Sequence, residues 1–256
     1  MANVLVCIKR VPETSGQILL SDDEMSIDAR HVGYTVSAHE ECAVELAVRV
    51  ASATGGEATV LSVGAAEAVE QIRNALAIGC SGAALIEADL ERFGPADIAG
   101  AIADFARGRA SQGSAFDLVL TGNDAADSGD FQVPVRLAYS LGIPVLTGIS
   151  TVSVGGGVAV AKGDGPDGTE VYRVPLPAVV AVMEGGVEPR YPSVPGRMKA
   201  KRTQVETVPT SVEPRGSGRV RLKLPAAMPS EVEILGNGAG AAAAVVDVLV
   251  KIGALS

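Results

Sequence analysis

A polar loop after a predicted strand is the best candidate for a ligand site in this sequence. The loop, residues 122–130, reads Gly-Asn-Asp-Ala-Ala-Asp-Ser-Gly-Asp and joins an apolar run at 116–121 to a helical pattern. Parallel sheets bind ligands at the carboxyl ends of their strands, where the next helix offers free backbone N–H groups to a phosphate. The loop contains no Lys or Arg and its acids oppose a phosphate, so binding must depend on backbone amides. An ordinary polar turn is the alternative.

Residue patterns of known catalytic and metal sites do not occur in the sequence. It has no GxSxG, HExxH or P-loop motif, and no spacing singles out two carboxylates as an acid and a base. The histidines are His31 and His39, and neither stands at ligand spacing from a cysteine. We therefore expect no catalytic residue and no metal ligand. His39 follows the N-cap of a predicted helix, where a polar capping neighbour is the more common role.

The cysteines and the hydropathy pattern predict a reduced, cytoplasmic protein. Cys7, Cys42 and Cys80 form no CxxC pair and lie in or beside apolar patterns, as small buried hydrophobes do. The first ten residues do not resemble a signal peptide, because their apolar run is short and the basic pair follows it. The longest uncharged apolar run has the length of one strand, well below the ~20 residues of a membrane span.

A proline-rich, basic segment is the best candidate for a contact with another molecule. Residues 188–202 read Glu-Pro-Arg-Tyr-Pro-Ser-Val-Pro-Gly-Arg-Met-Lys-Ala-Lys-Arg, after an apolar run at 176–183 that predicts a buried strand. Pro189, Pro192 and Pro195 argue against both strand and helix, so we expect a rigid loop in solvent with Val194 near its tip. Such loops often carry function. An ordinary proline-rich connection is the alternative.

Strands and helices alternate through the first two-thirds of the chain. Strands are expected at 4–8, 57–63, 83–86, 116–121 and 145–149, with helices between them. Ser37 and Glu40 form a capping box at the start of the first helix. This alternation predicts an α/β fold with a parallel, doubly wound, Rossmann-like sheet that is covered on both faces. An antiparallel hairpin at 152–160 and a strand at 171–174 follow, before the strand at 176–183.

Composition and the last quarter of the chain suggest one domain with a tail. The chain has 256 residues, 47% of them hydrophobic, and a net charge of −9, which argues against binding nucleic acid by bulk electrostatics. We expect the α/β domain at 1–203, including the loop at 184–203. Residues 204–256 lack a core pattern apart from a helix at 239–252, so a partner subunit should bury this tail. The glycines at 236–240 resemble a dinucleotide motif, but no second strand or acid follows them.

Several stretches of the sequence resemble motifs of one protein family. Residues 4–12 resemble the opening "VLVxxKRV", residues 43–49 resemble "AVEEAVR", and residues 72–79 resemble "IRxALAMGA". Residues 176–180 and 188–201 resemble "LPAVV…NEPRYxxLPxxMKAKKK". These are motifs of the beta subunit of electron transfer flavoprotein, and the resemblance covers about residues 2–203. It implies a sheet of the adenine-nucleotide alpha-hydrolase-like type, with a C-terminal helical arm.

The resemblance implies an electron carrier subunit rather than an enzyme. In that family the beta subunit forms a heterodimer with an alpha subunit, binds AMP and helps to hold FAD, most of which lies on the alpha subunit. Electrons pass from acyl-CoA or other dehydrogenases to a membrane quinone oxidoreductase. The segment 184–203 corresponds to the family's recognition loop, whose apolar anchor is usually Leu and is Val194 here.

The resemblance also assigns residues to two surfaces. The expected cofactor-binding residues are Cys7, Ser37, Ala38, His39, Glu40, Val63, Gly122, Ala125, Asp127, Ser128, Phe131, Gln132 and Val133. The expected partner-binding residues are Glu188, Pro189, Arg190, Tyr191, Val194, Pro195, Met198, Lys199 and Lys201.

The candidate nucleotide loop departs from the family pattern "GKQAIDDDxNQTG". Phe131 and Val133 replace an Asn and a Thr, His39 replaces an aromatic residue, and Thr14 replaces a Tyr. We therefore expect a divergent paralogue that serves a dedicated dehydrogenase. Two alternatives stay open. One is a flavin-bifurcating subunit with a second FAD in place of AMP, and the other is a nucleotide-binding regulatory module without electron transfer.

Overall fold

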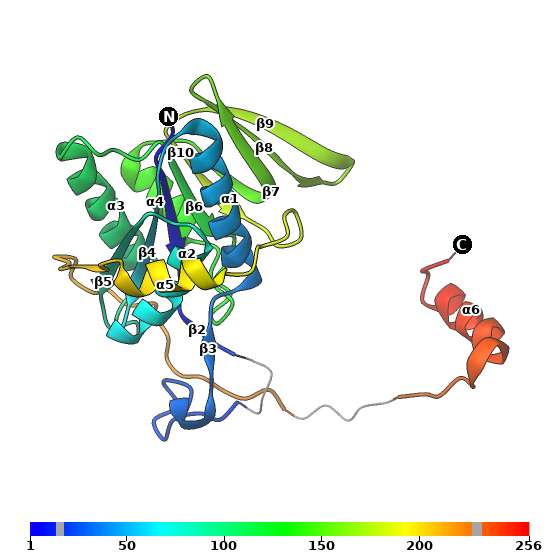
Figure 1. The fold of residues 1–256 in the computed structure, drawn as a ribbon. Helices are drawn as coiled ribbons and strands as arrows, with labels where there is room; N and C mark the ends of the chain where they lie inside the picture. Colours follow the sequence, from blue (N-terminus) through cyan, green and yellow to red (C-terminus); the bar gives the residue numbers. More distant parts are fainter. Residues whose placement is uncertain (14–17, 227–231, 256) are drawn as a thin grey trace. The chain divides into compact units, whose positions relative to one another are not determined.

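The computed structural model describes residues 1–13, 18–226 and 232–255. They form two compact units, Met1–Leu222 and Lys223–Ser256. The larger unit is an α/β fold around one large sheet (Figure 1). A small antiparallel pair, β2 (Val11–Pro12) and β3 (Tyr34–Thr35), lies outside that sheet.

The large sheet has nine strands in the order β11-β5-β4-β1-β6-β10-β7-β8-β9. The strands are β1 (Val4–Ile8), β4 (Ala58–Gly64), β5 (Gly82–Glu87), β6 (Leu118–Gly122), β7 (Val145–Gly155), β8 (Val158–Gly165), β9 (Gly168–Pro175), β10 (Ala178–Val182) and β11 (Glu206–Val208). Pairing is parallel from β11 to β7 and antiparallel among β7, β8 and β9. The prediction of a parallel sheet with an antiparallel addition is confirmed.

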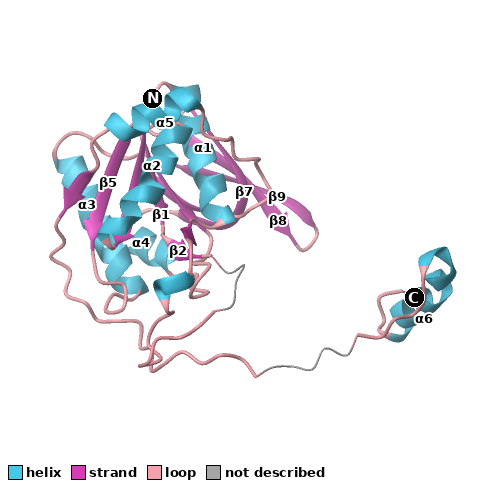
Figure 2. Cartoon of the chain, turned by 60° about the horizontal axis from the view of Figure 1, so that its bottom comes forward, coloured by secondary structure: helices cyan, strands magenta, loops and turns pink. Residues whose placement is uncertain are grey.

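Helices cover both faces of the sheet, as the alternating pattern predicts (Figure 2). They are α1 (Ala38–Thr54), α2 (Val69–Ile78), α3 (Pro95–Ser111), α4 (Val133–Leu141) and α5 (Val194–Arg202), with short 3₁₀ turns at Ala29–His31 and Ala66–Ala68. Successive side chains of β1 enter opposite cores, because a strand alternates its faces. Val4 and Val6 belong to the core under α1 and α2, and Leu5 belongs to the core under α3.

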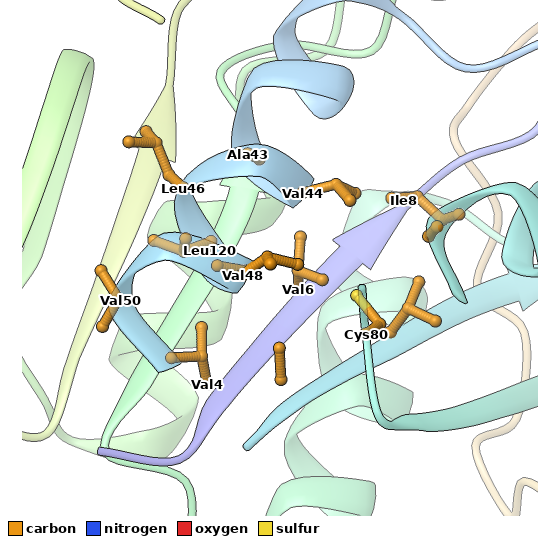
Figure 3. Packing of buried hydrophobic residues seen from close by; sticks show 14 of the residues in the cluster. Val4, Val6, Ile8, Ala43, Val44, Leu46, Val48, Val50, Cys80 and Leu120 are labelled. Carbon is orange, nitrogen blue, oxygen red and sulfur yellow. The ribbon is translucent and has the colours of Figure 1, made fainter. Parts of the chain in front are cut away.

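The core under α1 is built from small and branched apolar side chains. Figure 3 shows Val6 and Leu120 of the sheet facing Val44 and Val48 of the helix. The capping box starts this helix as predicted: the Ser37 hydroxyl accepts from the Glu40 N–H at 3.3 Å, and the Glu40 carboxylate accepts from the Ser37 N–H at 3.0 Å. The cap therefore fixes where α1 begins, directly beside the carboxyl end of β1.

The strand expected at 145–149 and the first arm of the hairpin expected at 152–160 form a single strand, β7. Its first half pairs with β10 in parallel and its second half pairs with β8 in antiparallel fashion. The register shifts between Val180 and Val182, opposite Leu146 and Ile149. Gly148 has a φ of +69°, a conformation that suits glycine at a bulge. The strand therefore bends at this glycine and continues where the sequence pattern suggested a break.

The prediction that residues 188–202 contain no helix is wrong. Helix α5 begins at Val194, with Ser193 as N-cap accepting from the Gly196 N–H at 3.1 Å. Pro195 lies in the first turn, where a helix needs no backbone donor, so this proline is compatible with the helix. The Arg73 guanidinium on α2 donates to the Ala200 carbonyl at 2.5 Å, which ties α5 to the larger unit.

The expected boundary at residue 203 also differs from the structure. Strand β11 pairs with β5, and the larger unit continues to Leu222. The Asp97 carboxylate on α3 accepts from the Arg215 N–H at 2.9 Å and from the Gly216 N–H at 3.0 Å. We call residues 209–222 the strap. The strap is irregular in sequence but has hydrogen-bond partners in its own chain.

The smaller unit contains a 3₁₀ turn, Gly238–Ala241, and helix α6 (Ala242–Lys251). A helix was expected here, at 239–252. None of the residues of α6 is buried. Its exposed apolar residues, with those that follow it, are Val245, Val246, Val248, Val250, Ile252 and Leu255. Coverage of this helix by a partner subunit stays a prediction.

Candidate functional site

A cavity of about 350 Å³ opens at the carboxyl ends of β1, β4 and β6. This volume is within the range of small-molecule sites, roughly 300–1,000 Å³. Its apolar lining residues include Cys7, Ile8, Leu61, Val63, Ile98 and Ile102. Its charged lining residues are Lys9, Arg10, Glu40, Glu91, Asp124, Asp127, Asp130 and Arg219. The cavity thus combines an apolar wall with a strongly charged one.

The structure brings most of the expected cofactor-binding residues together around this cavity. Those that line it are Cys7, Glu40, Val63, Gly122, Ala125, Asp127, Ser128 and Val133. The expected residues outside the lining are Ser37, Ala38, His39, Phe131 and Gln132. Phe131 is exposed, and the Gln132 side chain contacts Asp130 and Arg136. Thr14 lies outside the described residues. The binding roles of all these residues stay predictions.

The loop at 122–130 is joined to the start of α1 and the end of β1 by two side-chain contacts. The Lys9 ammonium lies 2.6 Å from the Asp127 carboxylate, and the two side chains are 22% and 25% exposed. His39 Nε2 lies 3.1 Å from the Asp124 carboxylate, while His39 Nδ1 accepts from the Glu184 N–H at 3.0 Å. A Cβ on Gly122 would come within 3.0 Å of Glu40 Cγ, so glycine permits this close approach. The start of α1 therefore faces the loop, as expected.

Glu40 is a buried carboxylate at the edge of the cavity. It accepts from the Lys9 N–H at 2.7 Å and from the Ser37 N–H at 3.0 Å. Burial raises its pKa to about 7, although these hydrogen bonds oppose the shift. Burial likewise raises the pKa of the neighbouring Cys7 thiol to about 12, with a smaller contribution from Glu40. Cys7 is therefore a neutral, apolar part of the lining rather than a nucleophile.

Several lining residues were missed by the sequence analysis. Arg10 follows β1 directly, and its guanidinium carbon lies 3.4 Å from the centre of the Tyr34 ring. Its position next to a strand end was a signal that could have been used. Ser217, Arg219 and Leu222 of the strap also line the cavity. Nothing in the sequence of the strap indicated that it returns to the carboxyl ends of the strands.

The expected partner segment is held against the larger unit at its start. Glu45 on α1 is 1% exposed and accepts from Arg190 Nε at 2.7 Å and Nη2 at 2.8 Å. It also accepts from Arg49 Nε at 2.5 Å. Burial alone would raise the pKa of Glu45, but the Arg190 and Arg49 hydrogen bonds lower it to about 2. This pair and α5 contradict the expectation of a loop that stands free in solvent.

Exposed apolar side chains remain on this anchored segment. Tyr191 is 94% exposed and Val194 is 73% exposed, and Met198 is also exposed one turn further along α5. Lys199 and Lys201 follow on the same helix. The segment thus presents apolar and basic side chains together at the surface. Its role in partner binding stays a prediction.

Fold and cavity place the protein in the class of parallel α/β proteins with a cavity at the carboxyl ends of their strands, the position where such sheets commonly bind ligands. No group of three or more His, Cys, Asp or Glu residues that could hold a metal ion occurs in the part of the chain that is described. Within those same ranges, no helix has the length and apolar character needed to cross a bilayer.

Comparison with known proteins identifies the family. The model of the electron transfer flavoprotein domain matches residues 25–213. Electron transfer flavoprotein subunit beta of Bacillus subtilis (strain 168) is 35% identical over 206 residues, which cover 80% of this chain and 77% of that protein. The corresponding protein of Syntrophomonas wolfei is 33% identical over 90% of this chain and 89% of its own length. That of Homo sapiens is 33% identical over 80% of this chain and 80% of its own length. The chain therefore belongs to the electron transfer flavoprotein family.

Proposed function

We propose that this chain is the beta subunit of an electron transfer flavoprotein and acts as an electron carrier subunit in the cytoplasm. It pairs with an alpha subunit, binds AMP in its cavity and helps to hold the FAD of the alpha subunit. Electrons come from acyl-CoA or other dehydrogenases and pass to a quinone oxidoreductase. The match to the family over residues 25–213 carries this proposal, because it includes the loop at 122–130 and the partner segment.

The residues of the cavity fit an adenine nucleotide. Leu61, Val63 and Ile102 supply an apolar surface for a flat base. The start of α4, at Val133, lies at the same cavity, where free N–H groups of a helix favour an anion. The flavin, when bound, supplies the electron-carrying chemistry. This chain's residues hold the nucleotide and present the surface to which an electron donor docks.

The exposed face of the partner segment fits a docking role. Val194 and Tyr191 provide apolar contact area, and Lys199 and Lys201 provide positive charge on a chain whose net charge is −9. A partner with acidic residues around an apolar pocket would be drawn to this face, mainly through a faster association rate. Val194 in place of the usual Leu lowers the anchor's burial energy by about 1 kcal/mol for the missing methylene.

Coexpression with the alpha subunit of the same organism tests the assignment. We expect the chain alone to be colourless and the coexpressed pair to copurify as a yellow heterodimer that contains FAD. Released nucleotides should include AMP when the denatured heterodimer is analysed by chromatography. A chain that remains monomeric beside its alpha subunit, or a heterodimer without a reducible flavin, would contradict the proposal.

The docking role of Val194 is tested by Val194→Asp in the heterodimer. A buried charge at the anchor should slow flavin reduction by the cognate dehydrogenase by about tenfold or more, while flavin content stays the same. Tyr139→Asp, at an exposed position on α4, is the matched control and should leave the rate unchanged. Loss of flavin from Val194→Asp would instead mean that the segment has a structural role.

A flavin-bifurcating subunit is the second candidate. The Gln132-Val133 pair resembles the bifurcating relatives, and the Phe131 and Gln132 side chains lie outside the cavity lining. A second FAD in place of AMP is then expected. Counting flavins per heterodimer separates one from two, and any reducible flavin rejects a purely regulatory nucleotide-binding module.

A further inference from the structure

Two of the three cations that line the cavity have no acidic partner, and one of these two, Arg10, has no polar partner for its side chain among the described residues. Of the three lining cations, Lys9 is paired with Asp127 at 2.6 Å. Arg219 donates to the backbone carbonyl of Met25 at 3.3 Å. The Arg10 side chain forms neither an ion pair nor a hydrogen bond with any residue that the structure describes. An arginine side chain that lines a cavity without such partners has N–H donors available for a ligand.

Arg10 is held in place by an aromatic ring rather than by a carboxylate. Its guanidinium lies over Tyr34 at 3.4 Å, and its Nε is buried without an acceptor among the described residues. Tyr34 in turn is fixed by the pairing of β3 with β2, opposite Pro12, and by Gln71, whose amide donates to its carbonyl at 3.3 Å. A buried donor without an acceptor is unfavourable, and a ligand oxygen that reached it would remove that penalty.

The loop at 122–130 offers fewer donors than the sequence suggested. The N–H groups of Ala125, Ser128 and Gly129 bind carbonyls inside the loop itself. Asp124, Asp127 and Asp130 also line the cavity, and their negative charges oppose an anion. Backbone amides of the loop are therefore a poor sole site for a phosphate, contrary to the expectation drawn from its sequence.

The strap brings a second arginine to the same cavity. The strap is held at one end by Asp97 and at the other by the Leu222 N–H, which donates to the Glu24 carbonyl at 2.7 Å. Arg219 lies between these two attachments and lines the cavity. Its neighbour Arg221 forms an exposed pair with Glu24 and is not part of the lining.

We infer that Arg10 is a phosphate-binding residue of the cavity, with Arg219 as a second, weaker contact. The inference rests on the proposed function, in which the cavity holds a nucleotide. Guanidinium groups suit this role because their planar donors bind phosphate oxygens in pairs and keep their charge at all relevant pH values. The stack on Tyr34 orients Arg10 in advance, so less side-chain freedom is lost on binding.

Calorimetric titration of the full-length chain with AMP and with adenosine tests this inference. Adenosine lacks the phosphate, so only AMP binding should depend on the arginines. Arg10→Gln should weaken AMP binding by about tenfold or more, as expected for a lost charge-assisted hydrogen bond, and leave adenosine binding within about twofold. Arg219→Gln should weaken AMP binding less. Arg221→Gln, the neighbouring strap arginine, is the matched control and should change neither.

Arg10→Lys and thermal unfolding guard against a folding defect. Lysine keeps the charge but not the paired donors, so its AMP affinity should lie between those of the wild type and Arg10→Gln. AMP should raise the unfolding temperature of the wild type more than that of Arg10→Gln. Equal weakening of AMP and adenosine, unchanged AMP affinity in Arg10→Gln, or no AMP binding by the wild type would overturn the inference. A heterodimer without flavin would reject the proposed function while leaving a measured phosphate effect of Arg10 intact.

Discussion

Glu40 and Glu45 lie on the same helix and are both buried, yet their pKa values shift in opposite directions. Glu40 has only neutral hydrogen-bond donors and a less direct influence from Lys9, so burial dominates and its pKa rises to about 7. Glu45 receives two guanidinium groups, and its pKa falls to about 2. Two residues of one type thus differ in charge state near pH 6 because of their partners. Glu40 responds to pH near neutrality, and Glu45 keeps its charge.

Glu45→Gln should destabilise the protein and loosen the partner segment. Losing the charged acceptor of Arg190 should lower the free energy of unfolding at pH 7 by about 2 kcal/mol. Because the folded pKa lies below the ordinary value, the stabilisation is present above pH ~4.5 and is lost as pH falls towards 2. Urea unfolding measures the loss, and trypsin cleavage after Arg190 should become faster. Glu41→Gln, exposed on the same helix, should change stability by less than about 0.5 kcal/mol. Equal effects of both variants would contradict the role of the pair.

Glu40→Gln should change how stability depends on pH. The folded pKa of Glu40 is raised, so the folded protein keeps a proton that the unfolded chain loses between pH ~4.5 and ~7. Stability of the wild type therefore falls with rising pH in this window, by at most about 1.4 kcal/mol per pH unit. Unfolding free energies measured at pH 5, 6 and 7 should show the variant gaining on the wild type as pH rises. Parallel stability curves for the wild type and Glu40→Gln would reject this prediction. Glu67→Gln, at an exposed position, is the control, and its stability should depend on pH in the same way as that of the wild type.

Local signals place most helices and strands, while contacts between distant residues decide what irregular segments do. Gly94 and Pro95 begin α3 and Gly142 ends α4, as their chemistry predicts. The strap carries no such signal. Its attachment to Asp97 joins residues that lie 118 positions apart in the chain. The strap therefore joins the sheet unit through contacts with distant residues, among them the buried Asp97 carboxylate, and not because of its own pattern.

Asp97→Ala should release the strap from α3. Three N–H groups, those of Gly94, Arg215 and Gly216, would lose their acceptor, at a cost of about 2–4 kcal/mol in unfolding free energy. Hydrogen–deuterium exchange should become faster across residues 209–222 and stay unchanged in β1. Asp104→Ala, exposed on the same helix, is the control and should leave the exchange of the strap as it is. A strap that remained protected in Asp97→Ala would show that other contacts hold it.

The chain divides into an α/β unit that buries its own core and a smaller unit with an apolar helix that buries none of its residues. An amphipathic surface helix normally hides one face in its own domain. Helix α6 exposes several valines instead, in a chain that is otherwise acidic. The proposed alpha subunit provides a natural surface for this helix, in keeping with the heterodimer.

A chain that ends at Leu222 should fold but pair poorly. Because no residue of α6 is buried, removing it should change the free energy of unfolding by less than about 0.5 kcal/mol. Copurification with a tagged alpha subunit should fall by about tenfold or more, since a partner contact that buries several valines contributes several kcal/mol. Full-length chain expressed in parallel is the control. Unchanged copurification of the shortened chain would place the heterodimer contact on the α/β unit alone.

Periodicity and capping chemistry were enough to predict the parallel sheet, its antiparallel addition, and the loop beside the start of α1. These features arise from residues close together in the chain, so the sequence carries them directly. The sequence could not show that Arg10 stacks on Tyr34, that Arg190 binds Glu45, or that the strap forms a wall of the cavity. Each of these contacts joins segments that only the folded backbone brings together, and the balance of burial and hydrogen-bond partners then sets the charge of carboxylates such as Glu45. Helix α5 was missed for a similar reason. A proline is compatible with the first turn of a helix and disrupts its interior, and only the structure shows that Pro195 lies in the first turn.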